Sequence, residues 1–308
     1  MTQSVENKLM VIIAGPTGVG KTSTAIKLAQ HYKTEIISAD SRQFYKGPKI
    51  GTASPTAAEL SAISHHFIAN LNLDEYYNVA KFEKDALELS LKLFENHKVV
   101  FIVGGSGLYI NALCHSIDDL PDADEILRQN LNTEFEKKGL KWLQDEVEHF
   151  DPTYFQQVDK KNPKRLLRAL EVIKATGKTY SQQRKSTKKQ RPFKILKIAL
   201  NLERAELFER INSRVDSMME NGLLAEAKEY YQYRNLNSLN TVGYKELFSF
   251  FDSNISLSRA IEDIKTNTRR YAKRQITWFK KDLDFQWFSP YDHEKIIQLI
   301  DSKFDENF

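Results

Sequence analysis

The sequence predicts a mixed α/β fold with a parallel sheet at its core, a helical insertion and a helical C-terminal part. Apolar runs rich in β-branched residues recur in the first third of the chain, and stretches with helical spacing of apolar residues separate them. Such alternation is typical of parallel sheets covered by helices. From about Pro121 the strand pattern is absent, and it returns once near residue 193.

The expected elements divide the chain into three parts. Residues 1–120 form the first part of the α/β core, residues 121–192 form the helical insertion, and residues 193–308 return to the core and end in helices. The expected elements of the core are a strand at 9–15, a helix at 22–32, strands at 34–40 and 98–107 with a helix at 78–97 between them, and a strand at 193–202. Helices follow to the end of the chain, with an interruption at Asn221 and Gly222.

Residues that could bind phosphate or take part in catalysis follow the first three expected strands. They occupy residues 15–22, 40–43 and 104–107. Because the carboxyl ends of parallel strands share one edge of the sheet, we expect these three stretches to converge there.

Composition excludes several classes of protein. The longest apolar run, residues 9–15, is too short to span a bilayer, and the first residues do not have the pattern of a signal peptide. The lone Cys114 excludes a disulfide or zinc framework within the chain, and we expect it to be buried. We therefore expect a cytoplasmic protein with no membrane association.

Positive charge is concentrated in two segments. The net charge is only +4, but residues 160–191 and 265–281 are rich in Lys and Arg. Such segments are either solvated helix faces or a surface for a polyanion.

The stretch AGPTGVGKTS contains a complete phosphate-binding loop, G-x-x-x-x-G-K-[ST]. It predicts a P-loop NTPase-like core in which backbone N–H groups and Lys21 bind phosphate and the Thr22 hydroxyl binds magnesium. An NTPase usually has a later strand that ends in Asp, whereas the strand at 98–107 ends in Gly-Gly-Ser-Gly. Asp40 could serve magnesium, or it could be a general base that faces the phosphates. The polar residues that follow Asp40 suit a heterocycle and favour the general base.

Two further stretches suit nucleic acid. In NPKRLLRALEV, Asn162 and Pro163 mark a helix start, and Arg165 and Arg168 share a face near its positive end. In TNTRRYAKRQITWFKK, basic and aromatic residues are interleaved, as phosphate contacts and base stacking require. Each stretch could instead be an ordinary surface helix, and we expect Ile276 and Phe279 to be buried. His65 and His66 are expected to be structural.

The sequence resembles the bacterial tRNA dimethylallyltransferases, also called tRNA isopentenyltransferases, over nearly its whole length. The resemblance rests on AGPTGVGKT, ISADSRQFYKGPKIGTASPT, VGGSGLYINAL, NPKRLLRALEV, LNTVGYKEL and TRRYAKRQITWF, in this order. Members of the family transfer a dimethylallyl group from dimethylallyl diphosphate to the exocyclic amino group of the adenine 3′-adjacent to the anticodon in tRNA. Magnesium assists the reaction and diphosphate is released.

The resemblance implies roles for individual residues. Asp40, Lys21 and Ser106 would be catalytic, and Ser106 stands where the family commonly has Thr. The diphosphate would bind to Gly15, Pro16, Thr17, Gly18, Val19, Gly20, Lys21 and Thr22, with magnesium on Thr22. The tRNA, through its anticodon stem-loop, would contact Asp40, Ser41, Arg42, Gln43, Ser106, Arg128, Lys164, Arg165, Leu166, Leu167, Arg168, Asn240, Thr241, Val242, Gly243, Tyr244, Lys245, Lys273, Arg274, Gln275, Ile276, Thr277, Trp278, Phe279 and Lys280. Asn240 departs from relatives that carry a basic residue there.

Two other functions compete with this one. An adenine-nucleotide isopentenyltransferase would not need the basic and aromatic C-terminal part. A small-molecule kinase or ATPase would bind ATP, and the absence of a second strand-end Asp disfavours it. A monomer is expected, because the sequence has no obvious apolar seam.

Overall fold

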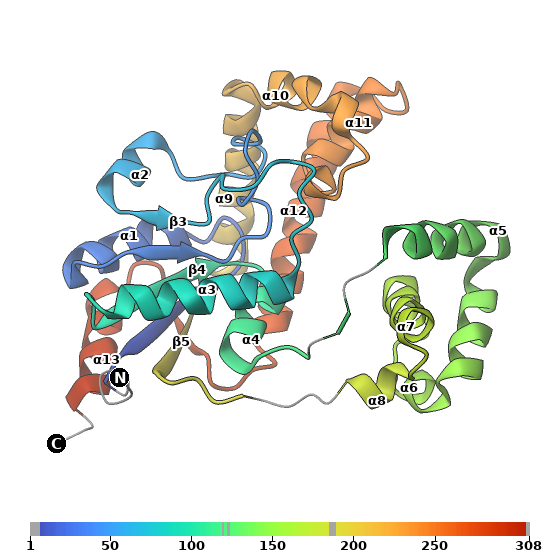
Figure 1. Ribbon diagram of the computed structural model, residues 1–308. Coiled ribbons are helices and arrows are strands. Elements are labelled where there is room, and N and C mark those ends of the chain that lie inside the picture. The colour runs from blue at the N-terminus through green and yellow to red at the C-terminus, as the bar shows by residue number, and fades with distance from the viewer. Residues whose placement is uncertain (1–6, 119, 122–123, 185–188, 306–308) are drawn as a thin grey trace. The chain divides into compact units, whose positions relative to one another are not determined.

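The computed structural model describes residues 7–118, 120–121, 124–184 and 189–305 (Figure 1). The chain divides into two compact units, one of residues 1–115 with 190–308 and one of residues 116–189. The second unit thus begins and ends a few residues before the expected insertion, 121–192. Within the described residues, no helix is long and apolar enough to cross a membrane.

The first unit is built on a six-stranded sheet in which every pair of neighbours is parallel. The strands lie in the order β3-β2-β4-β1-β5-β6. Their bounds are β1 Leu9–Ala14, β2 Ile36–Ser38, β3 His65–His66, β4 Val99–Gly104, β5 Lys194–Leu200 and β6 Gln286–Phe288. The central strands β1 and β4 are buried along their whole length, which explains their unbroken apolar sequences.

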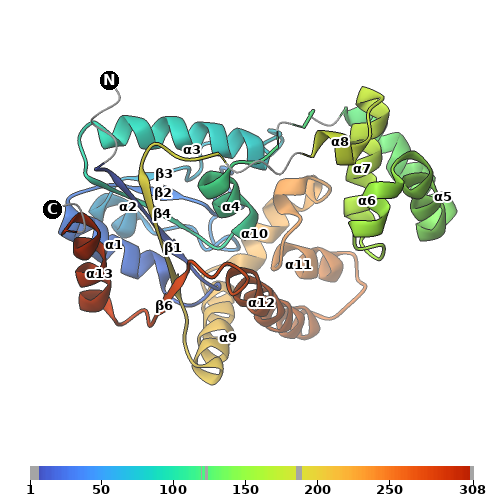
Figure 2. The same ribbon diagram turned by 90° about the horizontal axis from the view of Figure 1, so that it is seen from below.

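Helices cover both faces of this sheet (Figures 1 and 2). Alternate residues of β1 point to opposite faces, so Val11 packs with α1 and α13 on one face and Ile12 packs with α3 and α4 on the other. The bounds of these helices are α1 Lys21–Tyr32, α3 Val79–Phe94, α4 Gly107–His115 and α13 His293–Asp305. Cys114 of α4 is buried, as expected, and burial raises its pKa to about 12.

A second hydrophobic core joins the helices that follow β5. Val215, Leu223, Tyr244 and Ile264 are among its buried members, and they come from four different helices. These helices are α9 Arg204–Glu220, α10 Leu223–Glu229, α11 Tyr244–Phe251 and α12 Leu257–Phe279. Short 3-10 helices at Tyr231–Tyr233 and Asn237–Leu239 lie between α10 and α11 in the chain. The short helix α2, Ala57–Ala62, precedes β3 and is not part of this core. The predicted break between α9 and α10 is confirmed at Gly222, where φ is +97°.

The edge strand β6 was not expected from the sequence, which predicted helices to the end of the chain. Its three residues are at most half-buried and contain no β-branched side chain, so they give no strand pattern. Parallel pairing with β5 places this strand, and a buried lysine holds the segment that precedes it. The Lys197 ammonium of β5 donates hydrogen bonds to Asp282 (2.8 Å) and Asp284 (3.2 Å), just before β6 begins. The strand is therefore placed by contacts distant in sequence.

The second unit is wholly helical among its described residues, as the sequence predicts. Its elements are α5 Glu125–Phe150, α6 Pro152–Gln157, α7 Pro163–Thr176 and α8 Tyr180–Gln183. Gly139 has a φ of +78° and breaks α5 into two helical pieces. The unit has its own core, which includes Leu143, Val147, Leu166 and Leu170.

Candidate active site

The phosphate-binding loop connects β1 to α1. Gly18 and Gly20 have positive φ values, +83° and +104°, which explains why glycine occupies both positions. The Lys21 side chain turns back over the loop, and its ammonium donates to the Pro16 carbonyl at 2.8 Å. The Thr17 amide donates to Gln275 of α12 at 2.9 Å, so the loop is held from outside as well as from within.

The residues after β2 and β4 meet at the same edge of the sheet, as predicted. The Ser41 amide donates to the Ser106 hydroxyl oxygen at 3.1 Å, and the two hydroxyls are 3.3 Å apart. The Asp40 carboxylate accepts from the Arg42 amide at 3.0 Å, which fixes the turn after β2. The predicted convergence of the three stretches is therefore confirmed.

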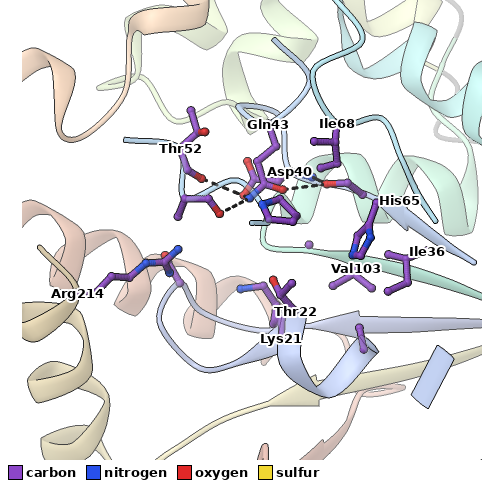
Figure 3. Close-up of a pocket in the computed structure, with 16 residues that line it drawn as sticks. Lys21, Thr22, Ile36, Asp40, Gln43, Thr52, His65, Ile68, Val103 and Arg214 are labelled. Atoms are coloured by element: carbon purple, nitrogen blue, oxygen red, sulfur yellow. Dashed lines mark hydrogen bonds between the residues drawn. The ribbon is translucent and has the colours of Figure 1, made fainter. Parts of the chain in front are cut away.

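These stretches enclose a small cavity of about 70 Å³. Lys21, Thr22, Asp40 and Gln43 are among the residues that line it, and Figure 3 shows Arg214 of α9 facing the same space. The cavity adjoins a larger one of about 1190 Å³, because the two share several lining residues. A phosphate-binding loop and the Asp40 carboxylate thus face a common space.

The cavity concentrates positive charge. Removal from water lowers the pKa of Lys21 to about 8, although Asp40 opposes this shift and Arg214 adds to it. Removal from water also lowers the pKa of Arg214. Cations held in a poorly solvated space gain from an anion that enters it. The arrangement therefore favours a ligand with several negative charges.

Two arginines that the sequence did not predict lie at the cavity and the phosphate-binding loop. Arg210 donates to the Val19 carbonyl of the phosphate-binding loop at 3.2 Å, and Arg214 lines the cavity. They are four residues apart on α9 and so lie on one face of that helix. The only sequence signal is this spacing, which is common on surface helices. The fold places this face of α9 against the phosphate-binding loop and the cavity.

His65 also lines the cavity, and its expected structural role stays a prediction. Its Nδ1 is 2.8 Å from the Ile63 carbonyl and therefore carries the proton. Its Nε2 is buried, has no hydrogen-bond partner among the described residues, and belongs to a ring that lines the cavity (Figure 3). His66 instead bonds Glu35 at 2.6 Å, so its structural role is confirmed.

Helix α12 presents two different faces. Gln275 and Phe279 are buried, and the Gln275 amide donates to the Gly105 carbonyl at 2.9 Å while it accepts from Thr17. These two side chains cannot contact RNA, so their prediction as contacts is corrected. Ile276 is half-buried against the core. The exposed face carries Tyr271, Lys273, Arg274, Thr277, Trp278 and Lys280.

The segment 240–245 is only partly exposed. Asn240 and Lys245 are exposed, Thr241 and Val242 are half-buried, and Gly243 and Tyr244 are buried. The Tyr244 hydroxyl donates to Glu226 at 2.6 Å. The prediction that Tyr244 contacts tRNA is therefore corrected, because a buried ring in a hydrophobic core is not available to a partner.

The second unit holds the remaining predicted contacts. Asn162 caps α7 and Pro163 opens it, as expected. Lys164 and Arg165 are exposed, Leu167 is half-buried, and Leu166 is fully buried, so its predicted tRNA contact is corrected. Glu171 binds both Arg168 (3.3 Å) and Arg128 (2.8 Å), which reduces the charge these two present.

Comparison with known proteins gives a consistent result. A family model described as IPP transferase matches residues 43–282. The chain is 48% identical over 293 residues to tRNA dimethylallyltransferase 1 of Phocaeicola vulgatus, covering 95% of this chain and 98% of the relative. It is 50% identical over 295 residues to tRNA dimethylallyltransferase of Christiangramia forsetii, covering 96% and 98%.

Solved structures agree. The tRNA isopentenylpyrophosphate transferase of Bacillus halodurans superposes with a TM-score of 0.72 at 39% identity, covering 98% of each chain. A eukaryotic dimethylallyltransferase acting on tRNA superposes with a TM-score of 0.74 at 28% identity. The match covers 92% of this chain and 74% of the eukaryotic chain.

The lowered pKa of Lys21 predicts a pH-dependent affinity for inorganic diphosphate. Protonated Lys21 attracts the anion, so binding should be full below pH 8 and weaken by up to about tenfold per pH unit above it. Calorimetric titration between pH 6.5 and 9.5 measures this. The variant Lys21→Arg stays charged throughout, so its profile should show only the ionisation of diphosphate itself and lack the loss above pH 8. A wild-type profile parallel to that of the variant would contradict the assignment.

Proposed function

The chain belongs to the IPP transferase family, and we propose that it transfers a dimethylallyl group from dimethylallyl diphosphate to the exocyclic amino group of the adenine 3′-adjacent to the anticodon in tRNA. The observation that carries this proposal is the shared cavity, in which Lys21 of the phosphate-binding loop faces the Asp40 carboxylate, in a chain that belongs to this family. A kinase can also place a carboxylate beside phosphate-binding cations, so the family membership favours prenyl transfer over γ-phosphate transfer.

The diphosphate is the leaving group, and its charge must be stabilised as it departs. The bond between the isoprenoid C1 and oxygen breaks while a bond from the adenine nitrogen to C1 forms. Lys21, Arg214 and the loop N–H groups supply positive charge where negative charge develops. Because an allylic cation is delocalised, stabilisation of the leaving group is the main electrostatic requirement.

Asp40 is proposed as the general base. An adenine amino group is a weak nucleophile and only very weakly acidic, so its proton leaves as the new bond to carbon forms. The Asp40 carboxylate, held by the Arg42 amide, is in the cavity to accept that proton. Ser106 is placed beside this turn by its bonds to Ser41 and would bind at the reacting centre.

Magnesium suits the oxygen ligands that the cavity offers. The Thr22 hydroxyl lines this space, and hard cations prefer such an oxygen ligand together with phosphate oxygens. Within the described residues, no cluster of His, Cys, Asp or Glu forms a metal site of its own. We therefore propose that magnesium enters with the diphosphate and neutralises part of its charge.

The tRNA is proposed to contact the exposed basic and aromatic side chains. On α12, the Trp278 and Tyr271 side chains are 41% and 39% exposed beside Lys273 and Arg274. Such a surface suits phosphate contact combined with base stacking. A cytoplasmic location is proposed because both substrates are found there, and the proposal of a monomer rests on the sequence alone.

A transfer assay tests the function. Radiolabelled dimethylallyl diphosphate and magnesium are offered with an unmodified anticodon stem-loop, with the same RNA lacking the target adenine, and with AMP. Label in the first RNA alone supports the proposal. Label in AMP alone would indicate an adenine-nucleotide isopentenyltransferase. Phosphate release from ATP without prenyl transfer would indicate a kinase or ATPase.

The variant Asp40→Asn should lose turnover but keep its substrates. Loss of a general base typically lowers kcat by about 10²–10⁴-fold, and the change removes a single local charge. Single-turnover transfer measures the rate, and filter binding measures the affinity for RNA. The exposed Asp74→Asn is the matched control and should behave as wild type. Near-normal transfer by Asp40→Asn would exclude Asp40 as the base.

The variant Arg165→Ala should weaken tRNA binding and reduce its dependence on salt. Each phosphate contact adds a slope of about 0.7–0.9 to the plot of log affinity against log salt. Removal of one contact should lower the slope by about that amount. Lys92→Ala, at an exposed position on α3, serves as the control. A reduced affinity with an unchanged slope would show that Arg165 does not contact phosphate.

A further inference from the structure

Glu226 of α10 accepts an unusual set of hydrogen bonds from one loop. Its Oε2 accepts from the amides of Lys49 and Ile50, both at 2.8 Å, and its Oε1 accepts from the amide of Gly51 at 2.9 Å. The Tyr244 hydroxyl also donates to Oε1, at 2.6 Å. One carboxylate thus satisfies three consecutive backbone donors, and hydrogen bonds to an ionised group are among the strong ones.

The loop is shaped to fit this carboxylate. Gly51 lies against the Tyr244 ring, and a Cβ atom there would be 2.6 Å from the ring carbons. Gly47 has a φ of +105° and lies against the Tyr230 hydroxyl. The two glycines therefore allow the loop backbone to approach α10 and α11 closely enough to reach Glu226.

The same loop holds a residue of the active site. It continues to Thr52 and Ala53, whose carbonyl oxygens accept from the Gln43 side-chain amide at 3.3 and 3.0 Å (Figure 3). The Ala53 amide in turn donates to the Ile50 carbonyl at 2.9 Å, which connects the part held by Glu226 to the part that holds Gln43.

Gln43 is linked onward to Asp40. The Ser38 hydroxyl donates to Gln43 Oε1 and accepts from the Asp40 amide, both at 3.3 Å. Gln43 and Asp40 both line the cavity. A continuous series of hydrogen bonds therefore connects Glu226, which is not part of the cavity lining, to the residues that face the substrates.

We propose that Glu226 is a positioning residue: through the loop at residues 49–53 it holds the Gln43 side chain and, through Ser38, the turn that carries Asp40 at the cavity. The proposal rests on the proposed function, because it assigns this turn to the target adenine. The proposal also gives Tyr244 a structural role, because its hydroxyl orients the Glu226 carboxylate. The buried segment around Tyr244 thus supports the adenine site from inside the protein.

The experiment is a double-mutant cycle between Glu226→Gln and Gln43→Ala. Glu226→Gln keeps the shape but replaces an acceptor oxygen by a donor, which opposes the loop amides. We expect kcat on the anticodon stem-loop to fall by roughly 10- to 100-fold, the scale on which small misplacement of reacting groups costs rate. The KM for dimethylallyl diphosphate should change by less than about twofold, because the phosphate-binding loop is untouched. In a protein that already carries Gln43→Ala, the Glu226→Gln substitution should lower kcat little further.

Amide hydrogen exchange of the loop gives a readout that does not depend on activity. Exchange at residues 49–51 should accelerate in Glu226→Gln and stay unchanged in the control Glu88→Gln, which alters an exposed carboxylate on α3. If Glu226→Gln fails to fold, Tyr244→Phe removes one hydrogen bond to the same carboxylate and should lower kcat less.

If the kcat of the double variant falls by the product of the two single-variant factors, the two residues act independently and the proposal is wrong. Unchanged amide exchange of the loop in Glu226→Gln would also overturn it. Wild-type protein that exchanges as expected but transfers no prenyl group would refute the proposed function instead. The two failures are therefore distinguishable.

Discussion

The close approach of three loop backbones at the carboxyl edge of the sheet is the constraint on which the site depends. Gly104 lies against the backbone of Ala39, and Gly105 lies against the side-chain amide of Gln275, so that a Cβ at either position would collide. Gln275 then bonds both Gly105 and Thr17. One buried amide therefore sets the distance between the phosphate-binding loop and the loop after β4, and larger residues would separate them.

This packing explains the electrostatics of the cavity. Lys21 has a lowered pKa because the loops exclude water around it, and the same exclusion strengthens its attraction for an anion. Arg214 arrives from α9, which is far away in sequence, and Asp40 offsets part of the positive charge. The protein keeps these charges in place before a substrate binds, so little reorganisation is needed when charge develops on a leaving group.

The sequence predicted what depends on local patterns. The buried strands β1 and β4, the phosphate-binding loop and the cap of α7 follow from apolar runs, glycine spacing and Asn162. It missed β6, Arg214 and the orientation of His65, since each depends on contacts between distant segments. Resemblance to a family predicted whole segments as RNA contacts, although Leu166, Tyr244, Gln275 and Phe279 prove to be internal.

These internal residues show why recognition motifs contain more than contacts. On α12, Lys273 and Arg274 lie on the exposed face, whereas Gln275 on the buried face holds the phosphate-binding loop through Thr17. A helix moves as a rigid element, so a partner that displaced the exposed face would also displace Gln275. The helix proposed to contact tRNA is therefore joined by the Gln275 hydrogen bonds to the loop proposed to hold the isoprenoid diphosphate.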